Sequence, residues 1–318
     1  MNLKKKNNDI VLEEVWCENG AGSTLPLLKY PLLEQTGIVE HCFTTRIGGV
    51  SKGIYESLNL SFTRGDEDAS VRENFRRLAG AMKTDVSKFV FTDQTHTTNV
   101  RRVTAEDAGK GIVKERDYTD IDGLITNEPG LVLSTFYADC VPLYFVDQVH
   151  RAIGMSHSGW KGTVGKMGAA TITAMKREFG TEAKDLVCAI GPSICQDCYE
   201  VSEDVADAFK EAFPGHADEI LLDKKNGKYQ LDLWRANEIV LTEAGVLKEK
   251  IAVTNICTCC NPDLLFSHRA SHGKRGNLGA FIYLKELPWS LRAVVQQHLR
   301  RHPPAESRQS RRLGRSHL

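Results

Sequence analysis

The sequence predicts an α+β fold: one domain in which mixed β-sheets are flanked by helices. Segments with strand character and segments with helical character follow one another without the strict alternation of a doubly wound parallel sheet. No internal repeat and no low-complexity linker interrupts the chain between Ile38 and Leu284. With 318 residues, the chain is long enough to bury a substantial core. We therefore expect residues 1–288 to form a single domain.

Short apolar runs bounded by turn residues mark the expected strands. The two most apolar runs, Leu131–Tyr137 and Leu143–Val146, are predicted to be strands, with Ala138–Pro142 between them. After a first strand the chain should turn at Gly48–Gly49. The other expected strands are Ile38–Thr45, Lys88–Phe91, Asn99–Val103, Ala152–Met155, Leu186–Ile190, Ile251–Ile256 and Ala280–Leu284.

Apolar residues that recur three and four positions apart predict the helices. In Asp68–Ala81 the side chains of Val71, Phe75 and Leu78 share one face, and charged residues occupy the other. A longer helix with a similar apolar stripe is expected from about Thr163 to Phe179. Two further helices are expected at Ser202–Phe213 and Asp232–Glu243.

The charge of the chain is unevenly distributed although it sums to zero. From Trp289 onward the tail carries seven Arg and a single acidic residue, Glu306. We expect residues 289–318 to be a basic, disordered tail that can form a short helix at Ser290–Arg300. No aromatic residue follows Trp289, which argues against a tail that binds single-stranded nucleic acid. The balanced charge of the whole chain predicts neither nucleic acid nor a membrane surface as partner.

The cysteine content and the N-terminus indicate the compartment. The first residues, Met1–Asp9, are polar and basic, and no long apolar stretch follows them, so we expect no signal peptide. The most apolar region, Leu131–Val146, is broken by Asp139 and Pro142 and is too short to span a bilayer. Nine cysteines is an odd number for a disulfide framework and is more typical of thiols in a reducing cytosol. The predicted location is cytoplasmic.

Three residues stand out as metal ligands: His96, Cys140 and His157. Each lies where a predicted strand gives way to a turn, a place from which a side chain can point into a cleft. Two His and one Cys with an open fourth position suit a catalytic zinc site. Their spacing is not a local metal signature, and His and Cys residues also serve as ordinary core or surface groups. Asp139 and Gln94, which are close to them in sequence, strengthen the hypothesis of a shared centre because they could orient a ligand or hold a substrate hydroxyl.

Other segments carry groups suited to phosphate or substrate. The segment His157–Gly162 joins a strand to a helix, and its glycines and Lys161 could form a seat for phosphate. It lacks the Gly-x4-Gly-Lys-Ser/Thr pattern of a nucleotide-binding P-loop. A glycine turn carries Arg46, whose guanidinium could grip phosphate or carboxylate, although a solvated turn explains it equally well. The remaining candidates in this set are Asn59, Asp139 and Arg269.

Two cysteine clusters have several readings. Cys195-x2-Cys198 has the spacing of a redox motif or a zinc knuckle, and Cys257-Thr-Cys259-Cys260 could complete four thiolates with it. The clusters are not at zinc-ribbon distance, and Cys195 closely follows a Gly-Pro turn. We therefore interpret them as ordinary thiols rather than a metal site. His268 and His272 have helical metal spacing, but the nearby glycines argue against a helix there.

Taken together, an ordered set of motifs resembles one family. The chain is similar to the laccase-domain family, formerly called polyphenol oxidases and now regarded as multifunctional purine nucleoside phosphorylases. The resemblance extends over about Ile38–Leu284. It rests on the segments Thr44–Ser51, Tyr55–Leu60, Asp93–His96, Asp122–Gly123, Ala138–Pro142, His157–Gly162, Ile190–Pro192 with Cys198–Val201, and Ser267–Arg269.

The resemblance implies an enzyme, and we expect residues 1–288 to be its single catalytic domain. Such an enzyme cleaves adenosine, inosine or guanosine with phosphate to give the base and ribose 1-phosphate. The resemblance also implies phosphorolysis of methylthioadenosine, deamination of adenosine, and zinc held by His96, Cys140 and His157. Purine nucleosides and phosphate are then the partners, and the oligomeric state stays open. Where members of the family often have a second Arg and an Asp after Arg269, this chain has Ala270–His272.

Two alternative functions are compatible with the same residues. A cysteine hydrolase would use Cys140 as nucleophile, a His as base, and Asp139 or Asn59 to orient it. A copper-dependent polyphenol oxidase would need His-x-His pairs for a trinuclear centre, and the sequence contains none. Copper is therefore a less favoured cofactor than zinc.

Overall fold

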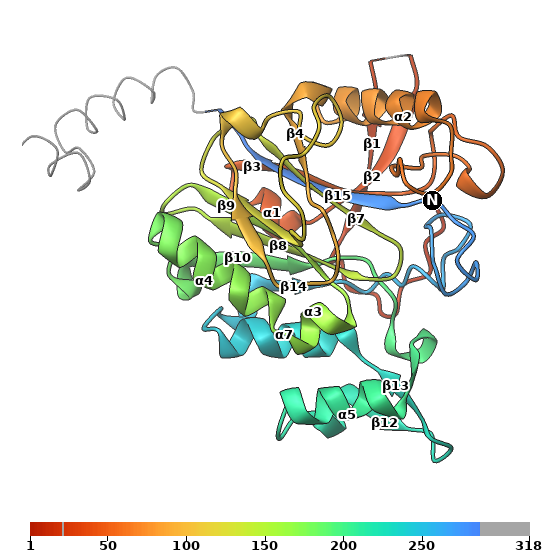
Figure 1. Cartoon of the computed structure of the whole chain (residues 1–318), viewed down its shortest axis with the longest axis vertical. Coiled ribbons are helices and arrows are strands. Elements are labelled where there is room, and N and C mark those ends of the chain that lie inside the picture. Colours follow the sequence, from red (N-terminus) through yellow and green to blue (C-terminus); the bar gives the residue numbers. More distant parts are fainter. Residues whose placement is uncertain (21, 287–318) are drawn as a thin grey trace, which may run out of the picture. The chain divides into compact units, whose positions relative to one another are not determined.

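Two six-stranded β-sheets dominate the part of the chain that the computed structural model describes, residues 1–20 and 22–286 (Figure 1). Both sheets contain parallel and antiparallel pairs. In the first, β7 (Val132–Tyr137) pairs in parallel with β4 (Phe89–Phe91) and antiparallel with β15 (Leu278–Leu284). In the second, β10 (Leu186–Ile190) pairs in parallel with β14 (Ile251–Val253) and antiparallel with β8 (Val141–Asp147). A separate three-stranded antiparallel sheet lies among the same described residues. The architecture confirms the predicted α+β class with mixed sheets.

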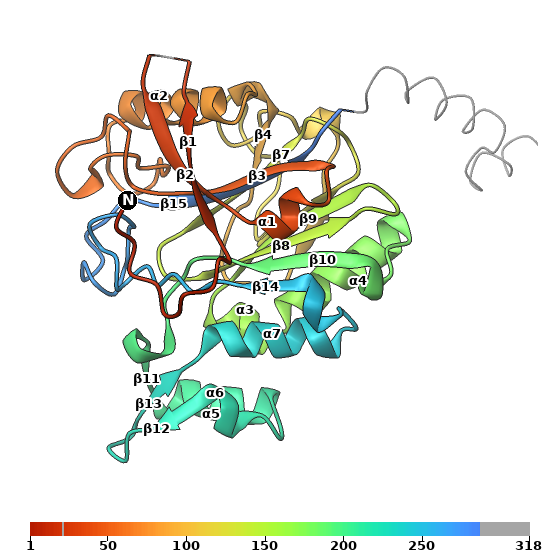
Figure 2. The same ribbon diagram turned by 180° about the vertical axis from the view of Figure 1, so that it is seen from behind.

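The first sheet follows the order β1-β2-β3-β15-β7-β4. It joins strands from both ends of the described chain, since β15 lies between β3 and β7 (Figure 2). Its strands are β1 (Glu13–Glu18), β2 (Thr24–Lys29), β3 (Val39–Thr44), β15 (Leu278–Leu284), β7 (Val132–Tyr137) and β4 (Phe89–Phe91).

The second sheet follows the order β14-β10-β8-β9-β6-β5. Its strands are β14 (Ile251–Val253), β10 (Leu186–Ile190), β8 (Val141–Asp147), β9 (Ala152–Ser158), β6 (Gly123–Thr126) and β5 (Val100–Arg102). The smaller sheet consists of β11 (Glu200–Ser202), β13 (Lys228–Leu231) and β12 (Leu221–Asp223).

The main core lies between the two large sheets. One cluster of buried side chains takes Phe43, Leu133 and Ile282 from the first sheet and Tyr144 and Met155 from the second. Burial of such a continuous apolar layer removes on the order of 25 cal/mol of unfavourable hydration per Å². This layer fixes how the two sheets face each other, and with them the loops at their edges.

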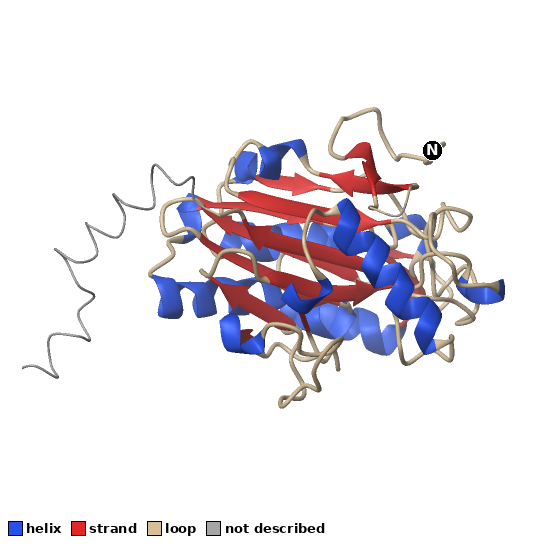
Figure 3. Ribbon diagram, turned by 90° about the horizontal axis from the view of Figure 1, so that it is seen from above, coloured by secondary structure: helices blue, strands red, loops and turns tan. Residues whose placement is uncertain are grey.

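Helices cover the outer faces of both sheets, as Figure 3 shows from above. The helix α2 packs its buried Phe75 and Leu78 against the outer face of the first sheet. On the outer face of the second sheet, α4 and α7 contribute Ile172, Met175 and Val240 to another cluster. The helices are α1 (Pro31–Glu34), α2 (Asp68–Ala81), α3 (Trp160–Val164), α4 (Met167–Phe179), α5 (Glu203–Ala212), α6 (Ala217–Ile220) and α7 (Leu233–Glu243).

Several predicted elements match the structure closely, and others need correction. The bounds of α2 and β10 agree with the prediction at both ends. The single helix expected from Thr163 to Phe179 is divided into α3 and α4, because Lys166 adopts a left-handed backbone conformation with φ of 60°. Strand β9 continues past Met155 to Ser158, and β8 begins at Val141 rather than Leu143.

The described residues through Leu284 form one compact unit. Among the described residues, no helix has the length and apolar character needed to cross a bilayer. The predicted basic tail at 289–318, with its helix at Ser290–Arg300, lies outside the described residues.

Candidate metal centre

The register of the second sheet brings the predicted ligands together. In the antiparallel pair of β8 and β9, Pro142 lies opposite His157 and Val141 lies opposite Ser158. Cys140 immediately precedes β8, so it reaches the same end of the sheet as His157. An isolated bridge between Asp93 and Ile121 carries the loop with His96 to that end. The three residues, which are distant in sequence, thus converge because the β8–β9 pair and the Asp93–Ile121 bridge lie at the same end of the sheet.

His96, Cys140 and His157 form a compact group of metal-binding atoms. One ligand atom from each residue lies within 4.8 Å of the others. The two imidazole rings are 4.9 Å apart, centroid to centroid, at an interplanar angle of 76°. His96 is exposed, Cys140 is half-buried and His157 is buried. The group therefore has one face in contact with solvent and one face in the protein.

The donor chemistry of this group fits a transition-metal ion. Two imidazoles and one thiolate are ligands that zinc prefers, and three protein ligands leave a fourth position for another molecule. The Nδ1 of His157 is engaged with Asp122 at 2.7 Å, which leaves its Nε2 available to a metal. Metal-binding histidines usually have such a carboxylate partner on the second ring nitrogen. The residues present thus match the donor set of a transition-metal ion such as zinc.

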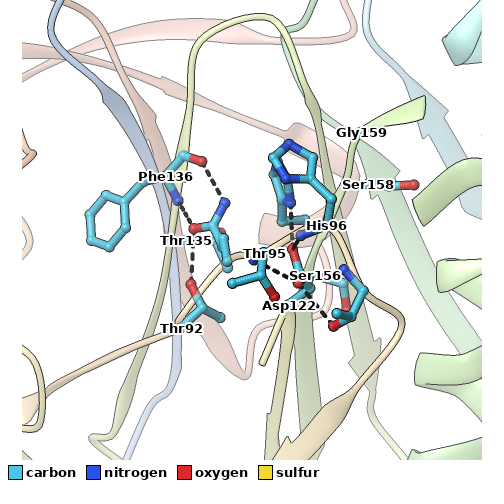
Figure 4. A network of polar contacts seen from close by, with 12 residues as sticks. Thr92, Thr95, His96, Asp122, Thr135, Phe136, Ser156, Ser158 and Gly159 are labelled. Carbon is cyan, nitrogen blue, oxygen red and sulfur yellow. Dashed lines mark hydrogen bonds and ion pairs between the residues drawn. The ribbon is translucent and has the colours of Figure 1, made fainter. Parts of the chain in front are cut away.

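Asp122 is the residue that organises the centre. Its side chain is completely buried, and its carboxylate contacts His157 and the backbone N–H of His96, at 3.2 Å. The N–H groups of Thr95 and Thr97 and the hydroxyl of Thr97 donate to its other oxygen. Figure 4 shows His96, Thr95 and Asp122 within this network. One carboxylate therefore fixes both the His157 ring and the loop that carries His96.

The charges of the centre stabilise one another in the absence of a metal. Burial alone raises the pKa of the Cys140 thiol, but the positive charge of His157 and hydrogen bonds from His157 and His96 lower it to about 6. Burial lowers the pKa of His157, whereas the Cys140 thiolate and Asp122 raise it to about 9. Burial raises the pKa of Asp122, but its bond to His157 lowers it below its usual range. The metal-free centre thus favours a thiolate beside an imidazolium.

The loop before His96 is braced by Gln94. The Gln94 side-chain amide donates to the carbonyl of Phe136 at 2.8 Å and accepts from its N–H at 2.7 Å. The hydroxyl of Thr92 also donates to Gln94, and Figure 4 shows this second network around Phe136 and Thr92. His96 itself has a positive φ of 67°, a conformation uncommon for a residue other than glycine. The Gln94 side chain therefore attaches the His96 loop to the backbone of β7 and is not a candidate metal ligand.

Asp139, next to Cys140, accepts hydrogen bonds from two neighbouring loop residues. One carboxylate oxygen accepts from the Thr258 hydroxyl at 2.6 Å, and the other accepts from the N–H of Arg269 at 2.7 Å. Its own backbone is left-handed, with φ of 87°. The carboxylate thus ties the Cys140 turn to the loop after β14.

A cleft of about 730 Å³ opens beside the metal-binding group. This volume is within the range of small-molecule sites. Aromatic side chains and several Arg residues share its wall with the three candidate ligands. The lining includes Phe62, Arg64, Arg72, Phe91, His96, Arg116, Tyr118, Phe136, Cys140, His157, Arg275 and Asn277.

None of the five predicted substrate-binding residues, Asp139 among them, lines this cleft. Arg46 donates to the carbonyls of Glu56 and Pro262 and lies over the Phe266 ring. Asn59 is buried and holds a loop. The Lys161 ammonium lies 5.6 Å from the Trp160 ring centroid. Arg269 donates to the carbonyls of two residues near β11, Cys198 and Glu200. Their assignment to substrate or phosphate stays a prediction.

Two Arg residues outside the predicted substrate-binding set, Arg64 and Arg275, lie in the cleft instead. Burial, and then the charge of Arg64, lowers the pKa of Arg275 to about 10. The guanidinium of Arg64 has no hydrogen bond or ion pair with the described residues, and the Nε of Arg275 is buried without a partner among them. Two neighbouring cations without an acidic partner favour the binding of an anion.

Fold and centre together define a class of protein: a mixed-sheet α+β protein with a transition-metal donor set of two His and one Cys at a large cleft. Comparison with known sequences gives the family. Residues 40–285 match the family model described as multi-copper polyphenol oxidoreductase laccase, and the chain belongs to this family. The resemblance noted from the motifs is therefore confirmed.

The similar proteins include well-covered bacterial relatives and a human one. The purine nucleoside phosphorylase YlmD of Bacillus subtilis is 40% identical over 248 residues, covering 77% of this chain and 88% of the relative. The human purine nucleoside phosphorylase LACC1 is 34% identical over 253 residues, covering 77% of this chain and 56% of the relative. The crystal structure of YlmD from Geobacillus stearothermophilus superposes with a TM-score of 0.77 at 33% identity, covering 86% of this chain and 100% of that one.

Proposed function

We propose that this protein is a purine nucleoside phosphorylase that binds zinc through His96, Cys140 and His157. In this reaction phosphate attacks C1′ of the ribose, and the purine leaves as the free base. The observation that carries the proposal is the convergence of these three residues at one wall of a cleft large enough for a nucleoside. The relatives named purine nucleoside phosphorylase support the choice of substrate.

The cleft offers chemistry for both halves of the reaction. The aromatic side chains Phe62, Tyr118 and Phe136 line it and supply flat apolar surfaces against which a purine ring can stack. The positive charge that phosphate requires is supplied by Arg64, whose guanidinium has no partner among the described residues, and by Arg275, whose Nε has none. We assign phosphate to these two residues in preference to Arg46, which does not line the cleft and whose Nε and Nη1 donate to backbone carbonyls.

A zinc ion bound here would supply a Lewis acid that polarises an oxygen or lowers the pKa of a water. Asp122 holds the His157 ring in one orientation and fixes its Nδ1, so that Nε2 faces Cys140. Gln94 and Asp122 hold the His96 loop in place before substrate arrives. The metal-binding side chains are therefore already in position before substrate binds. Such preorganisation lowers the barrier of a reaction because less ordering is needed to reach the transition state.

We extend the proposal to phosphorolysis of methylthioadenosine and deamination of adenosine. Deamination needs a proton carrier as well as a metal, and zinc deaminases of nucleobases use a Glu for that purpose. The one Glu among the residues that line the cleft, Glu115, makes no hydrogen bond or ion pair with the three ligands, and both oxygens of Asp139 are committed to Thr258 and Arg269. A water in the cleft is therefore the proton carrier that this account assigns to deamination.

A second candidate function is favoured by one specific contact. Cys140, His157 and Asp122 are connected in the order thiol, imidazole, carboxylate, which is the order of a cysteine-hydrolase triad. Asp122 takes the orienting position that the sequence had suggested for Asp139 or Asn59. Metal analysis separates the two functions, because stoichiometric zinc that is lost in Cys140→Ala supports the metalloenzyme and a metal-free enzyme inactivated by alkylation supports the hydrolase.

The proposed location is the cytoplasm. The structure contains nine free cysteines and no disulfide among its described residues, which include every cysteine of the chain. Free thiols in this number are typical of a reducing compartment. Purine nucleosides and phosphate, the proposed substrates, need no membrane or nucleic-acid partner.

Product analysis by chromatography tests the proposed function directly. Adenosine is incubated with the zinc-loaded protein in the presence and absence of phosphate. Adenine that forms only with phosphate demonstrates phosphorolysis, and inosine that forms under both conditions demonstrates deamination. If neither product appears from adenosine, and inosine and guanosine are also unchanged, the proposed function is wrong.

A further inference from the structure

A second group of metal-binding side chains lies apart from the cleft. Cys195 and Cys198 follow β10, and Cys257 and Cys260 follow β14. Strands β10 and β14 pair in parallel, and a bridge between Ser193 and Cys257 continues that pairing past their ends. Two Cys-x2-Cys segments that are far apart in sequence therefore meet. Within the group, the four sulfur atoms all lie within 4.8 Å of one another.

The spacing of the sulfur atoms matches a shared tetrahedral ion. The Sγ of Cys260 is 4.0 Å from that of Cys195 and 3.5 Å from that of Cys198. A tetrahedral zinc ion with Zn–S bonds of about 2.3 Å separates its thiolates by about 3.8 Å. A disulfide would bring two sulfur atoms to about 2.05 Å. The observed separations therefore correspond to four thiolates around one ion and not to two disulfides.

The surroundings of the sulfur atoms suit thiolates that carry negative charge. The backbone N–H groups of Cys195 and Cys260 donate to the Sγ of Cys257, at 3.2 and 3.4 Å. The ammonium of Lys6 hydrogen-bonds to Cys195 and forms an ion pair with Asp197 at 2.7 Å. Such N–H donors and a nearby cation offset the excess negative charge of a tetrathiolate site.

We propose that Cys195, Cys198, Cys257 and Cys260 bind one Zn²⁺ ion as a structural site, distinct from the His96–Cys140–His157 centre. Cys195 and Cys257 are buried and the other two are half-buried, and four protein ligands complete the coordination. Binding releases the protons of the four thiols to solvent and changes no oxidation state. This site contradicts our interpretation of the cysteine clusters as ordinary thiols, and it does not depend on the proposed function.

The site would clamp the loops that support the cleft. Ile194, next to Cys195, donates its N–H to the carbonyl of Asp139, and Thr258, next to Cys257, donates its hydroxyl to the Asp139 carboxylate. The carbonyl of Cys198 accepts from Arg269. Because Asp139 precedes Cys140, an ion that joins the two cysteine segments also fixes the turn that carries Cys140.

The clamp also includes the N-terminal segment. Lys4 donates its N–H to the side chain of Asn261 at 2.7 Å and accepts from it through its carbonyl. Lys6 donates its N–H to the carbonyl of Asn255 and contacts Cys195 through its side chain. A metal here would therefore connect three segments, which is the role of structural zinc in proteins.

Metal analysis of full-length variants tests the proposal. The variant Cys140→Ala/His157→Ala lacks the first centre and keeps the four cysteines, because neither substituted residue belongs to the cysteine cluster. We expect this variant, purified from cells supplied with zinc, to contain about one zinc per chain. X-ray absorption at the zinc edge should then show four sulfur neighbours at about 2.3 Å. Absence of metal, iron in place of zinc, or a shell with nitrogen neighbours overturns the proposal.

A matched pair of substitutions locates the site. Adding Cys260→Ala to the variant should remove the remaining zinc, whereas adding Cys259→Ala, the adjacent thiol outside the group of four, should leave it bound. If Cys260→Ala yields no folded protein, the spectrum of the parent variant still decides. Zinc that survives Cys260→Ala in folded protein, or that Cys259→Ala removes, contradicts the assignment. Activity plays no part in these readouts, so failure of the proposed function is distinguishable from failure of this site.

Discussion

Substitution of Asp122 by Asn should weaken the metal centre more than any change that leaves the three candidate ligands intact. The carboxylate of Asp122 accepts five hydrogen bonds and is completely buried. Asn has nearly the same shape, but one of its two polar atoms is an NH₂ group that donates. In either orientation this group faces N–H or O–H donors, so at least two of the five bonds are lost.

The size of the effect follows from these contacts. A buried donor left without a partner costs about 1–3 kcal/mol, so two of them lower the free energy of unfolding by about 2–6 kcal/mol. Loss of the carboxylate partner of a ligating His typically lowers metal affinity by about 10- to 100-fold. In free energy, that loss corresponds to about 1.4–2.8 kcal/mol. Both changes should appear together, since the same carboxylate holds His157 and the His96 loop.

The assay is competition for zinc with a chromophoric chelator, with unfolding followed in parallel by denaturant titration. Only the more weakly bound zinc, which we expect at the three-ligand centre, is titrated, so zinc held by the four cysteines does not affect the measured affinity. Asp120→Asn is the matched control, because Asp120 is exposed and accepts from the Thr95 hydroxyl at 2.9 Å without touching His157. The control should change zinc affinity less than about twofold. Unchanged zinc affinity in folded Asp122→Asn would refute the role of Asp122.

Three further outcomes follow from the geometry of the centre. Without a metal, His157 and His96 hold the pKa of Cys140 at about 6, so its thiolate form predominates above pH 6 and is lost as the pH falls below it. Iodoacetamide should therefore modify Cys140 at pH 7, where about 90% of it is thiolate, much faster than Cys17, whose pKa is raised by burial. Equal modification of these two thiols, read by mass spectrometry, contradicts this. Gly159→Ala would place a Cβ 3.0 Å from the His96 ring and 3.1 Å from the Cys140 Sγ. Because this contact displaces two candidate ligands, zinc affinity measured by chelator competition should fall about tenfold. In the control Gly162→Ala the nearest contact of the new Cβ is 3.5 Å, so zinc affinity should be unchanged. Removal of zinc from the first centre with a chelator should abolish phosphorolysis, and re-addition of zinc should restore it; activity that persists in protein shown by metal analysis to lack this zinc contradicts the metal's role.

Local patterns in the sequence were sufficient for much of the secondary structure. The helix α2 was predicted to the residue because its apolar stripe, Val71, Phe75 and Leu78, has helical spacing and packs on the first sheet. The break between α3 and α4 was missed because Lys166 takes a left-handed conformation that its residue type does not suggest.

Sequence motifs predicted the three candidate ligands but not the side chains that hold them in place. The structure brings His96, Cys140 and His157 together as expected. The role of Asp122 depends on the pairing of β6 with β9, where Gly123 lies opposite Ser156, and no local pattern contains that register. The motif Asp122–Gly123, quoted among the family segments, was the available signal.

The other functional residues that the sequence did not predict come together only through contacts between distant parts of the chain. Arg64 and Arg275 are far apart in sequence and approach each other only across the cleft. The two Cys-x2-Cys segments were dismissed as a metal site because of their separation, yet the parallel pairing of β10 and β14 places them side by side. Sequence spacing is therefore a poor guide to a metal site whose ligands follow neighbouring strands.

The most direct test of the central claim is phosphate-dependent formation of ribose 1-phosphate from inosine, followed by phosphorus NMR, in the wild-type and Cys140→Ala proteins. We expect product with the wild type and a loss of at least about 100-fold in rate with Cys140→Ala, because that variant lacks one of the three candidate ligands of the metal centre. The cysteine cluster stays intact in both proteins, so the comparison isolates the His96–Cys140–His157 centre. Equal rates in the two proteins, or no ribose 1-phosphate from the wild type, would contradict the account.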